Sequence, residues 1–263
     1  MENSQEEKPK EIQSLDQKIK RRNFISFTTF FVLGGAGLGA WKWLLNSPIE
    51  PSGGITGGTR VPLRRALNTT ELAFRRFFSP NHLVKTYPKS MAAKKVRQNS
   101  DIGLDDKSFS LENWKLSVEK ENKNFLTLGI DEIKAFPKTE IVFDFKCVEG
   151  WDQIQYWGGI RFIDFIEHFK LSDYTQYKYV GMETPDKNYY VGLDMESALH
   201  PQTILAYEMN GKPIPMNHGA PLRLIIPVKY GIKNIKRIGK ISFSNERPRD
   251  YWAESGYDYY SGL

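Results

Sequence analysis

The sequence has very little cysteine: Cys147 is the single one among 263 residues. A lone cysteine cannot form an intramolecular disulfide, so the folded chain depends on packing or on a bound cofactor for its stability. No strong zinc-ligand spacing, catalytic triad, P-loop or dinucleotide-binding motif accompanies it. The part from residue 63 onward also has no internal repeat and no low-complexity tract. These absences exclude several common classes of site and leave Cys147 as the residue to explain.

The residues that are present suffice for a globular fold. Hydrophobic residues make up 40% of the sequence and aromatic residues 13%, which is enough material for a core. Global disorder is therefore excluded. The length suits one large domain or two small ones.

Positive charge is concentrated in one stretch. The net charge of the sequence is +6, but residues 60–97 hold ten lysines and arginines against Glu71 alone, a net +9, whereas residues 98–263 carry −4. A basic stretch of this density attracts an anion: a phosphate-bearing ligand, a lipid headgroup surface or a nucleic acid. On charge alone, an ordinary solvated face explains it equally well.

An apolar run from Phe24 to Leu45 has about the 20 residues that a membrane-spanning helix needs. The residues before it, Lys20-Arg21-Arg22-Asn23-Phe24-Ile25, resemble a twin-arginine export signal. A plain signal-anchor with a basic cytoplasmic flank explains them as well. Both interpretations place the rest of the chain outside the cytoplasm. Asn46-Ser47-Pro48 contains no clear small-x-small cleavage site, which favours a retained anchor.

The predicted organisation has four parts. Residues 1–23 are a cytoplasmic basic segment, residues 24–45 a transmembrane anchor or uncleaved signal, residues 46–62 a linker rich in proline and glycine, and residues 63–263 the functional domain. We expect the chain to be anchored in the inner membrane with this domain in the periplasm. The chain would then contact membrane lipid through its amino-terminal helix, and the basic stretch would lie on the side of the membrane without nucleic acid.

Two helices are predicted in the domain. Asn68 and Glu71 form a capping pattern for the first. Its residues expected to face a core are Leu72, Ala73, Phe74 and Phe77. Gly158-Gly159 would open the second, over Gly159–Phe169. The buried face of this second helix is expected to consist of Phe162, Phe165, Ile166 and Phe169.

Short strands are predicted through the rest of the domain. The run Ile141–Cys147 has strong strand propensity and would end at the cysteine, and Asn210-Gly211 is a hairpin signal. The other predicted strands are Tyr177–Met182, Tyr189–Leu193, Ile204–Met209, Leu222–Ile226 and Ile235–Phe243. Short strands mixed with a few helices, without regular βαβ alternation, indicate an α+β domain.

The residue patterns by themselves give only weak signals for a site. His218 lies in a loop with glycine and proline, and Lys229, Lys233 and Lys236 follow it. Ordinary structural roles explain Cys147 as a small buried hydrophobic residue and His218 as a hydrogen-bonded loop residue.

Three separated segments resemble one family in the same order. Residues Phe143–Trp151 look like the segment that carries the molybdenum-binding cysteine in the sulfite oxidase superfamily, closest to its protein-methionine-sulfoxide reductase group. Residues Gly219–Lys236 are similar to the pterin-binding segment of that group. Residues Phe78–His82 resemble the Arg-Asn-His stretch of sulfite oxidases, although Pro80 replaces the arginine. The resemblance covers roughly residues 75 to 250 and would be hard to obtain by chance.

The resemblance implies a mixed β-sheet domain that holds a molybdenum–molybdopterin cofactor. The thiolate of Cys147 would be the metal ligand and catalytic residue, because a thiolate is a soft ligand suited to a metal held by pterin sulfurs. The residues implied to bind the rest of the cofactor are Phe78, Asn81, His82, Thr184, His218, Arg223, Asn234, Ile235 and Lys236. Convergent N–H groups and cations at the end of this set suit a phosphate.

The resemblance also implies an activity. Oxygen-atom transfer is expected, with sulfoxides such as protein methionine sulfoxide as substrate and a membrane-embedded heme subunit as electron donor. Sulfite is a small dianion that needs a cationic pocket, and Cys147-Val148-Glu149 lacks the arginine-containing sequence that follows the cysteine in sulfite oxidases. His218 departs from this interpretation, because it matches sulfite oxidases where the reductase group usually has asparagine.

Two alternatives stay open on the sequence. One is a dehydrogenase of sulfite or another small oxyanion. The other is a membrane-anchored interaction module without enzymatic activity, which would use the basic stretch at residues 60–97. Neither a heme-binding cytochrome domain nor the carboxyl-terminal dimerisation domain of sulfite oxidases is expected.

Overall fold

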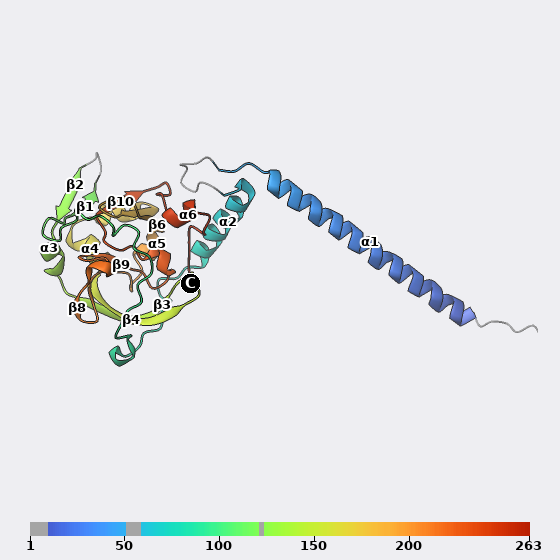
Figure 1. Cartoon of the computed structure of the whole chain (residues 1–263), viewed down its shortest axis with the longest axis horizontal. Helices are drawn as coiled ribbons and strands as arrows, with labels where there is room; N and C mark the ends of the chain where they lie inside the picture. Colours follow the sequence, from blue (N-terminus) through green and yellow to red (C-terminus); the bar gives the residue numbers. More distant parts are fainter. Residues whose placement is uncertain (1–9, 51–58, 121–123) are drawn as a thin grey trace, which may run out of the picture. The chain divides into compact units, whose positions relative to one another are not determined.

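The structure is a computed structural model that describes residues 10–50, 59–120 and 124–263. The chain divides into two compact units, Met1–Pro48 and Ile49–Leu263. The first contains helix α1 (Lys10–Asn46) (Figure 1). Its part Lys20–Asn46 is long and apolar enough to cross a membrane, and this part includes the whole predicted run from Phe24 to Leu45. Its position near the amino terminus suits a signal sequence as well as an anchor.

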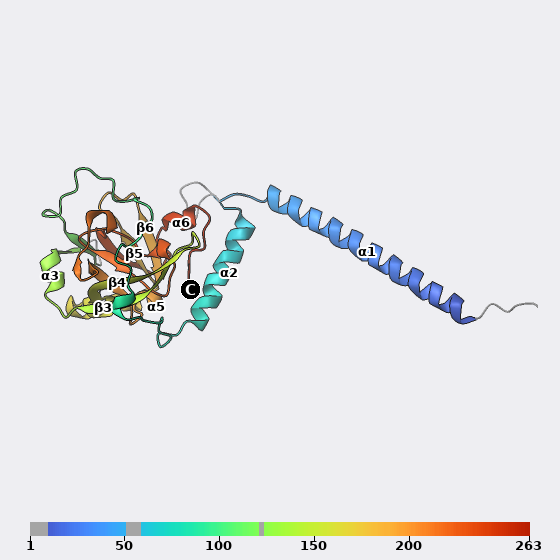
Figure 2. The same cartoon turned by 60° about the horizontal axis from the view of Figure 1, so that its bottom comes forward.

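In the second unit, the described strands form two sheets (Figures 1 and 2). The first has the order β2-β1-β10-β5-β6 and is mixed, because β1 and β10 run parallel while its other pairs are antiparallel. The second has the order β3-β4-β7-β8 with β9 paired to β7, and its pairs are antiparallel. This arrangement confirms the predicted α+β class.

The bounds of these elements follow. The strands of the first sheet are β1 (Leu116–Glu119), β2 (Phe125–Leu128), β5 (Tyr179–Glu183), β6 (Tyr190–Asp194) and β10 (Lys240–Ser244). Those of the second are β3 (Thr139–Lys146), β4 (Asp152–Arg161), β7 (Ile204–Met209), β8 (Lys212–Pro213) and β9 (Arg223–Ile225). The helices are α2 (Val61–Phe77), α3 (Ile130–Lys134), α4 (Phe162–His168), α5 (Met195–Ala198) and α6 (Tyr251–Glu254).

Most predicted strands are confirmed. Strands β3, β5, β6, β7 and β9 begin and end within two residues of their predicted bounds. Asn210 and Gly211 have φ angles of 52° and 71° and connect β7 to β8 as the predicted hairpin. The prediction over Ile235–Phe243 is wrong in its first half, because β10 begins only at Lys240. The residues before β10 cross the domain as an irregular segment, and the side chains of Ile235 and Ile238 fill the core.

The predicted helix over Gly159–Phe169 begins too early. Strand β4 continues through Gly158 and Gly159 to Arg161, and α4 begins only at Phe162. A Cβ atom on Gly159 would lie 2.1 Å from the carbonyl oxygen of Leu205 in the neighbouring strand β7. Glycine is therefore needed at a bulge where two backbones approach closely, and it does not open a helix here.

The prediction for α2 is wrong in its start and in its orientation. The helix begins at Val61, where proline occupies the first turn, so Asn68 lies inside it. The side chains of Leu72, Phe74 and Phe77 are 53%, 57% and 85% exposed and do not face a core. The helix instead turns Arg64, Glu71 and Arg75 toward the domain, where polar partners hold them.

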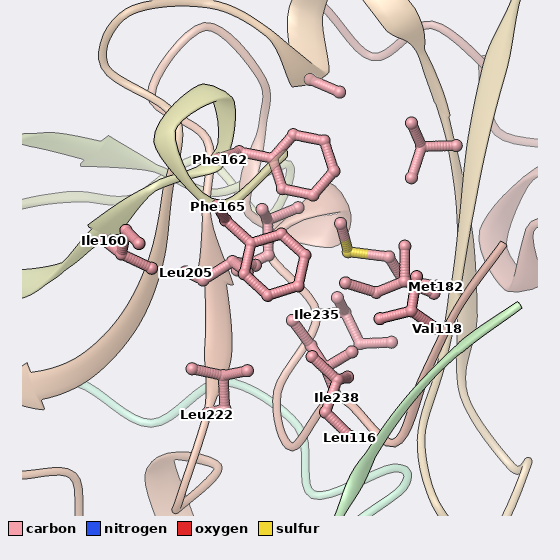
Figure 3. Close-up of a cluster of buried hydrophobic side chains, with 14 of the residues drawn as sticks. Leu116, Val118, Ile160, Phe162, Phe165, Met182, Leu205, Leu222, Ile235 and Ile238 are labelled. Carbon is pink, nitrogen blue, oxygen red and sulfur yellow. The ribbon is translucent and has the colours of Figure 1, made fainter. Parts of the chain in front are cut away.

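The main core lies between the two sheets. Figure 3 shows Phe162 and Phe165 of α4 facing apolar residues from strands of both sheets. The other labelled residues of this cluster are Leu116, Val118, Ile160, Met182, Leu205, Leu222, Ile235 and Ile238. A smaller cluster includes Phe143 and Phe145 of β3 with Trp157 of β4. This second cluster fixes the strand that leads to Cys147.

Replacing Phe165 by alanine should destabilise the domain by about 4 kcal/mol, because the ring is fully buried and its removal leaves a cavity. Chemical unfolding of the full chain in detergent, followed by tryptophan fluorescence, measures this loss. Phe125→Ala is the matched control, since Phe125 is 53% exposed, and should change stability by less than about 1 kcal/mol. Equal losses for the two variants would contradict the assigned core.

Candidate active site

Cys147 directly follows strand β3 and begins a tight turn. Its N–H donates to the carbonyl oxygen of Trp151 at 2.9 Å, and its own carbonyl accepts from Gly150 at 3.1 Å. Gly150 has a φ of +84°, which favours glycine at the corner of the turn. The ring of Trp151 stacks on Phe145 with centroids 6.0 Å apart. Packing from the strand therefore fixes the position of the thiol, which is only 4% exposed.

Cys147 lines a cavity whose empty volume, open solvent included, is about 580 Å³. Its walls come from segments far apart in the sequence. The lining residues are Asn99, Ser100, Ile102, Cys147, Val148, Glu149, Tyr189, Gly231, Ile232, Asn234, Lys236, Trp252 and Tyr257. A second, more open cavity also borders Cys147, beside Trp151 and Tyr230.

Lys236 supplies a buried cation to this cavity. Its ammonium group donates to the carbonyl oxygens of Asn99 and Ser100. Burial, and then the positive charge of Arg223, lowers the pKa of Lys236 to about 7. The described residues therefore only partly offset the cost of burying the positive charge of Lys236. An anionic ligand would raise the pKa of Lys236 again.

Arg223 lies behind Lys236 and is 3% exposed. Its guanidinium donates to the carbonyl oxygens of His218 at 3.0 Å and Asn234 at 3.1 Å, and it lies 4.6 Å from the centroid of the Trp157 ring. Burial lowers its pKa to about 9. Among the described residues, its Nε has no hydrogen-bond partner. An unpaired buried donor is costly and is expected where a ligand is to be bound.

His218 is the third basic residue of this cluster. Burial, followed by the charges of Arg223 and Lys236, lowers the pKa of His218 to about 4, so its imidazole is neutral at pH 7. Gly219 has a φ of +98°, and a Cβ atom there would lie 2.6 Å from the Cβ of Lys236. Glycine thus allows the His218 loop to pack directly on the segment that carries Lys236.

Asn234 and Ile235, the other predicted residues of this segment, have structural roles. The side-chain oxygen of Asn234 accepts from the Ile226 N–H at 2.8 Å, and its amide donates to the Tyr230 carbonyl at 3.1 Å. Asn234 therefore shapes the loop that forms one wall. The side chain of Ile235 is fully buried in the core, so only its backbone is available near the site.

Thr184 is buried but does not line the cavity itself. Its hydroxyl donates to Asp186, and the same oxygen accepts from the N–H of Tyr189 at 3.1 Å. Tyr189 does line the cavity and donates from its hydroxyl to the Ile232 carbonyl at 2.5 Å. Thr184 is thus placed to orient Tyr189.

The structure does not bring Phe78, Asn81 and His82 to Cys147. Phe78 and His82 line a separate cavity that shares no residue with the one at Cys147, and Asn81 is exposed. Their predicted contact with a pterin is therefore without geometric support in the described residues. The segment that reaches the cavity is Asn99-Ser100.

Sequence reasoning missed several lining residues. Asn99 lies two positions after Arg97. This spacing is a local signal that a search for a stretch similar to Arg-Asn-His could have found. Glu149 was part of the cysteine segment, but its place in the cavity was not foreseen; it accepts from the Trp151 indole at 2.7 Å. Trp252 and Tyr257 had no local signal, because only the tertiary fold brings them to Cys147.

The donor set fits a metal held by a cofactor. Within the ranges that the structure describes, no group of three or more His, Cys, Asp or Glu side chains could hold a metal ion. Burial raises the pKa of Cys147, so the free thiol is neutral, whereas a bound metal would keep it deprotonated. The cations beyond it suit an anionic group of the same ligand.

Comparison with known proteins agrees with this chemistry. The family model "oxidoreductase molybdopterin binding domain" matches residues 104–252. The chain is 34% identical over 186 residues to a putative protein-methionine-sulfoxide reductase subunit YedZ1 of Azospira oryzae, covering 70% of each chain. It is 35% identical over 175 residues to the protein-methionine-sulfoxide reductase catalytic subunit MsrP of Campylobacter jejuni, covering 59% of this chain and 58% of that protein. The match thus spans less than two thirds of the Campylobacter protein.

Among solved structures, the sulfane dehydrogenase SoxCD of Paracoccus pantotrophus aligns with a TM-score of 0.47 and 16% identity, over 65% of this chain and 47% of that chain.

Binding of an anion in the cavity should weaken as pH rises through 7. With a pKa of about 7, the protonated fraction of Lys236 falls about tenfold between pH 6 and pH 8, and the affinity for an anion should fall by the same factor. Calorimetric titration of cofactor-free protein with sulfate, whose charge is constant in this range, measures it. Lys236→Met should bind sulfate weakly and without this pH dependence. The same dependence in that variant would contradict the assignment to Lys236.

Proposed function

Because this chain belongs to the sulfite oxidase-type oxidoreductases with a molybdopterin-binding domain, we propose that it binds a molybdenum–molybdopterin cofactor through Cys147 and reduces sulfoxides. The observation that carries the proposal is the cavity in which Cys147 and Lys236 are both lining residues. A soft sulfur ligand and a buried cation suit a metal and an anionic group of one ligand.

Each part of the cavity has a role in holding the cofactor. Cys147 is the metal ligand, and the stacked Trp151 keeps the turn that presents it in place. Lys236 and the backbone of Asn234-Ile235-Lys236 bind the phosphate, while Arg223 and His218 support this segment from behind. When bound, the molybdenum centre supplies two-electron oxygen-atom transfer, and the protein positions it and excludes competing ligands.

Sulfoxide is favoured over sulfite as substrate by the lining of the cavity. The cavity that Cys147 lines is also lined by Val148, Glu149 and the aromatic residues Trp252 and Tyr257. A carboxylate beside the thiol repels a small dianion, whereas apolar and aromatic surfaces accept a neutral sulfoxide and the thioether formed from it. The net reaction breaks the sulfur–oxygen bond, takes up two electrons and two protons, and releases a thioether and water. Methionine sulfoxide in proteins is the proposed substrate, in line with the names of the relatives.

The electrons for this reaction have to come from a partner. We propose a membrane-embedded heme subunit as the donor, with α1 retained as an anchor in the inner membrane and the domain in the periplasm. The length and apolar character of Lys20–Asn46 support the anchor. The family relationship supports the partner.

Cys147→Ser should lose activity by about a hundredfold or more, because a serine hydroxyl is a harder and far less acidic ligand than a thiol. Molybdenum content and sulfoxide turnover of the purified full chain are the two measurements. Val148→Ala is the matched control: it changes the neighbouring lining residue and should retain molybdenum. A fully active serine variant with normal metal content would exclude Cys147 as the ligand.

The direction of the reaction can be tested with redox dyes. A reduced dye and methionine sulfoxide should give thioether with two electrons consumed for each sulfoxide, while an oxidised dye and sulfite should give no turnover. Glu149→Gln should improve any residual sulfite oxidation, because it removes the negative charge beside Cys147. Turnover with sulfite and none with sulfoxide would establish the small-oxyanion dehydrogenase instead.

A further inference from the structure

Helix α2 has an unusual distribution of residues: Arg64, Glu71 and Arg75 face the domain, whereas most of its large apolar residues face solvent. Arg64 and Glu71 are 3% and 0% exposed, whereas Leu63 and Phe77 are 46% and 85% exposed. Exposed residues spaced three or four positions apart form a stripe along the helix, and Arg65, Thr69, Leu72 and Arg76 are exposed beside it. The stripe consists of Leu63, Ala66, Thr70, Ala73 and Phe77.

Polar contacts account for the attachment of α2 to the domain without using the stripe. Arg64 donates to the Ala253 carbonyl at 2.6 Å. Arg75 forms an ion pair of 3.0 Å with Glu196, and Glu71 pairs with Arg247. The contacts that attach α2 to the domain therefore do not involve the apolar stripe. A contiguous exposed apolar surface of this kind marks an interaction site.

The apolar surface continues beyond the helix. Phe74 stacks on Tyr260 with centroids 6.1 Å apart and an interplanar angle of 8°. A groove of about 700 Å³ lies beside Phe74 and Phe77 and reaches Leu263 at the carboxyl end. Both views show α2 along one side of the domain, next to this end of the chain (Figures 1 and 2). We call the stripe together with Phe74 and Leu263 the α2 face.

The exposed charged residues of α2 and of the segment after it are positive, while Glu196, whose side chain is 50% exposed, pairs with Arg75. Arg65, Arg76 and Lys85 are exposed. The single acidic residue between positions 60 and 97 is Glu71, which is fully buried and paired. An apolar stripe with flanking arginines and lysines is the composition of a helix that lies in the interface of an anionic bilayer.

The covalent chain places the start of α2 close to α1. Only Ser47 and Pro48 separate the last residue of α1 from Ile49, which pairs with Arg60 at the start of α2. Whatever the orientation of the two units, any membrane that α1 enters is therefore within a few residues of α2. A binding partner of α2 that lies away from the membrane would not require so few residues between α1 and α2.

We propose that the α2 face binds the anionic headgroup surface of the bilayer that α1 crosses. Phe74 and Phe77 enter the interface, and Arg65 and Arg76 contact lipid phosphates. The domain is then held in one orientation on the membrane, with its electron donor in the same bilayer. The proposal rests on the retained anchor of the proposed function, and its test below uses no turnover, so it can fail while the enzymatic proposal stands.

A cysteine-labelling experiment tests the proposal in the full chain. The native Cys147 is buried, so a cysteine introduced by Thr70→Cys can be labelled selectively with an environment-sensitive fluorophore. Thr127→Cys is the matched control, because Thr127 is also exposed but lies on β2. Each labelled chain is reconstituted in vesicles of phosphatidylcholine with or without phosphatidylglycerol. Unsubstituted chain treated with the same label gives the background.

In anionic vesicles, the label at position 70 should shift to the blue and be quenched by spin-labelled lipid, and the label at position 127 should do neither. The shift should be lost in phosphatidylcholine alone, at high salt, and in the Arg65→Glu/Arg76→Glu variant. Equal exposure of both positions to water would overturn the proposal. Burial of position 70 that depends on the density of protein in the vesicle would also overturn it, because this dependence indicates a second copy of the chain. So would burial that requires an added membrane subunit, because this requirement indicates a protein partner.

Discussion

The burial of several basic residues in one place is the constraint on which the site depends. Arg223, Lys236 and His218 lie together, and burial lowers the pKa of each of them. A buried charge without a full partner opposes folding, and one guanidinium nitrogen has no acceptor among the described residues. A bound anion removes this cost, so ligand binding and stability are coupled at this point of the fold. Under the proposed function, Lys236 would hold the phosphate end of the cofactor and leave its metal end for Cys147, because both residues line the same cavity.

The fold brings the two ends of this site together through different kinds of structure. Strand β3 is held by the aromatic cluster around Phe143 and Phe145, so Cys147 follows a rigid element. Arg223 begins β9, whereas Lys236 lies on the irregular segment between β9 and β10, which is fixed because Ile235 and Ile238 fill the main core. A regular strand therefore positions the proposed metal ligand, while packed loops carry polar groups suited to the proposed phosphate. This division is typical of sites in which a rigid scaffold carries functional loops.

The sequence predicted the strands better than the helices, for a physical reason. Alternating and apolar runs such as Ile141–Cys147 report directly on burial, and β3 confirms them. The prediction for α2 failed because it assumed that apolar residues face the core, whereas ion pairs attach this helix and its apolar stripe is exposed. Gly158-Gly159 was assigned to a helix start because a sequence pattern cannot show the approach of β7. Within the site, His218 to Lys236 form one continuous segment and could be predicted together, whereas Asn99 and Trp252 come from distant parts of the chain.

The positive charge of the protein separates into two parts with different chemistry. The sequence suggested one basic stretch, residues 60–97, and could not distinguish a phosphate ligand from a lipid surface. In the structure, the cations near the candidate phosphate site belong to the segment 218–236, outside that stretch, and they are buried with lowered pKa values. Most of the stretch itself is exposed, and its arginines flank an apolar helix. Buried cations bind one small anion in a fixed geometry, whereas exposed ones attract an extended anionic surface. The two halves of the charge therefore need different partners, and an explanation of either one does not account for the other.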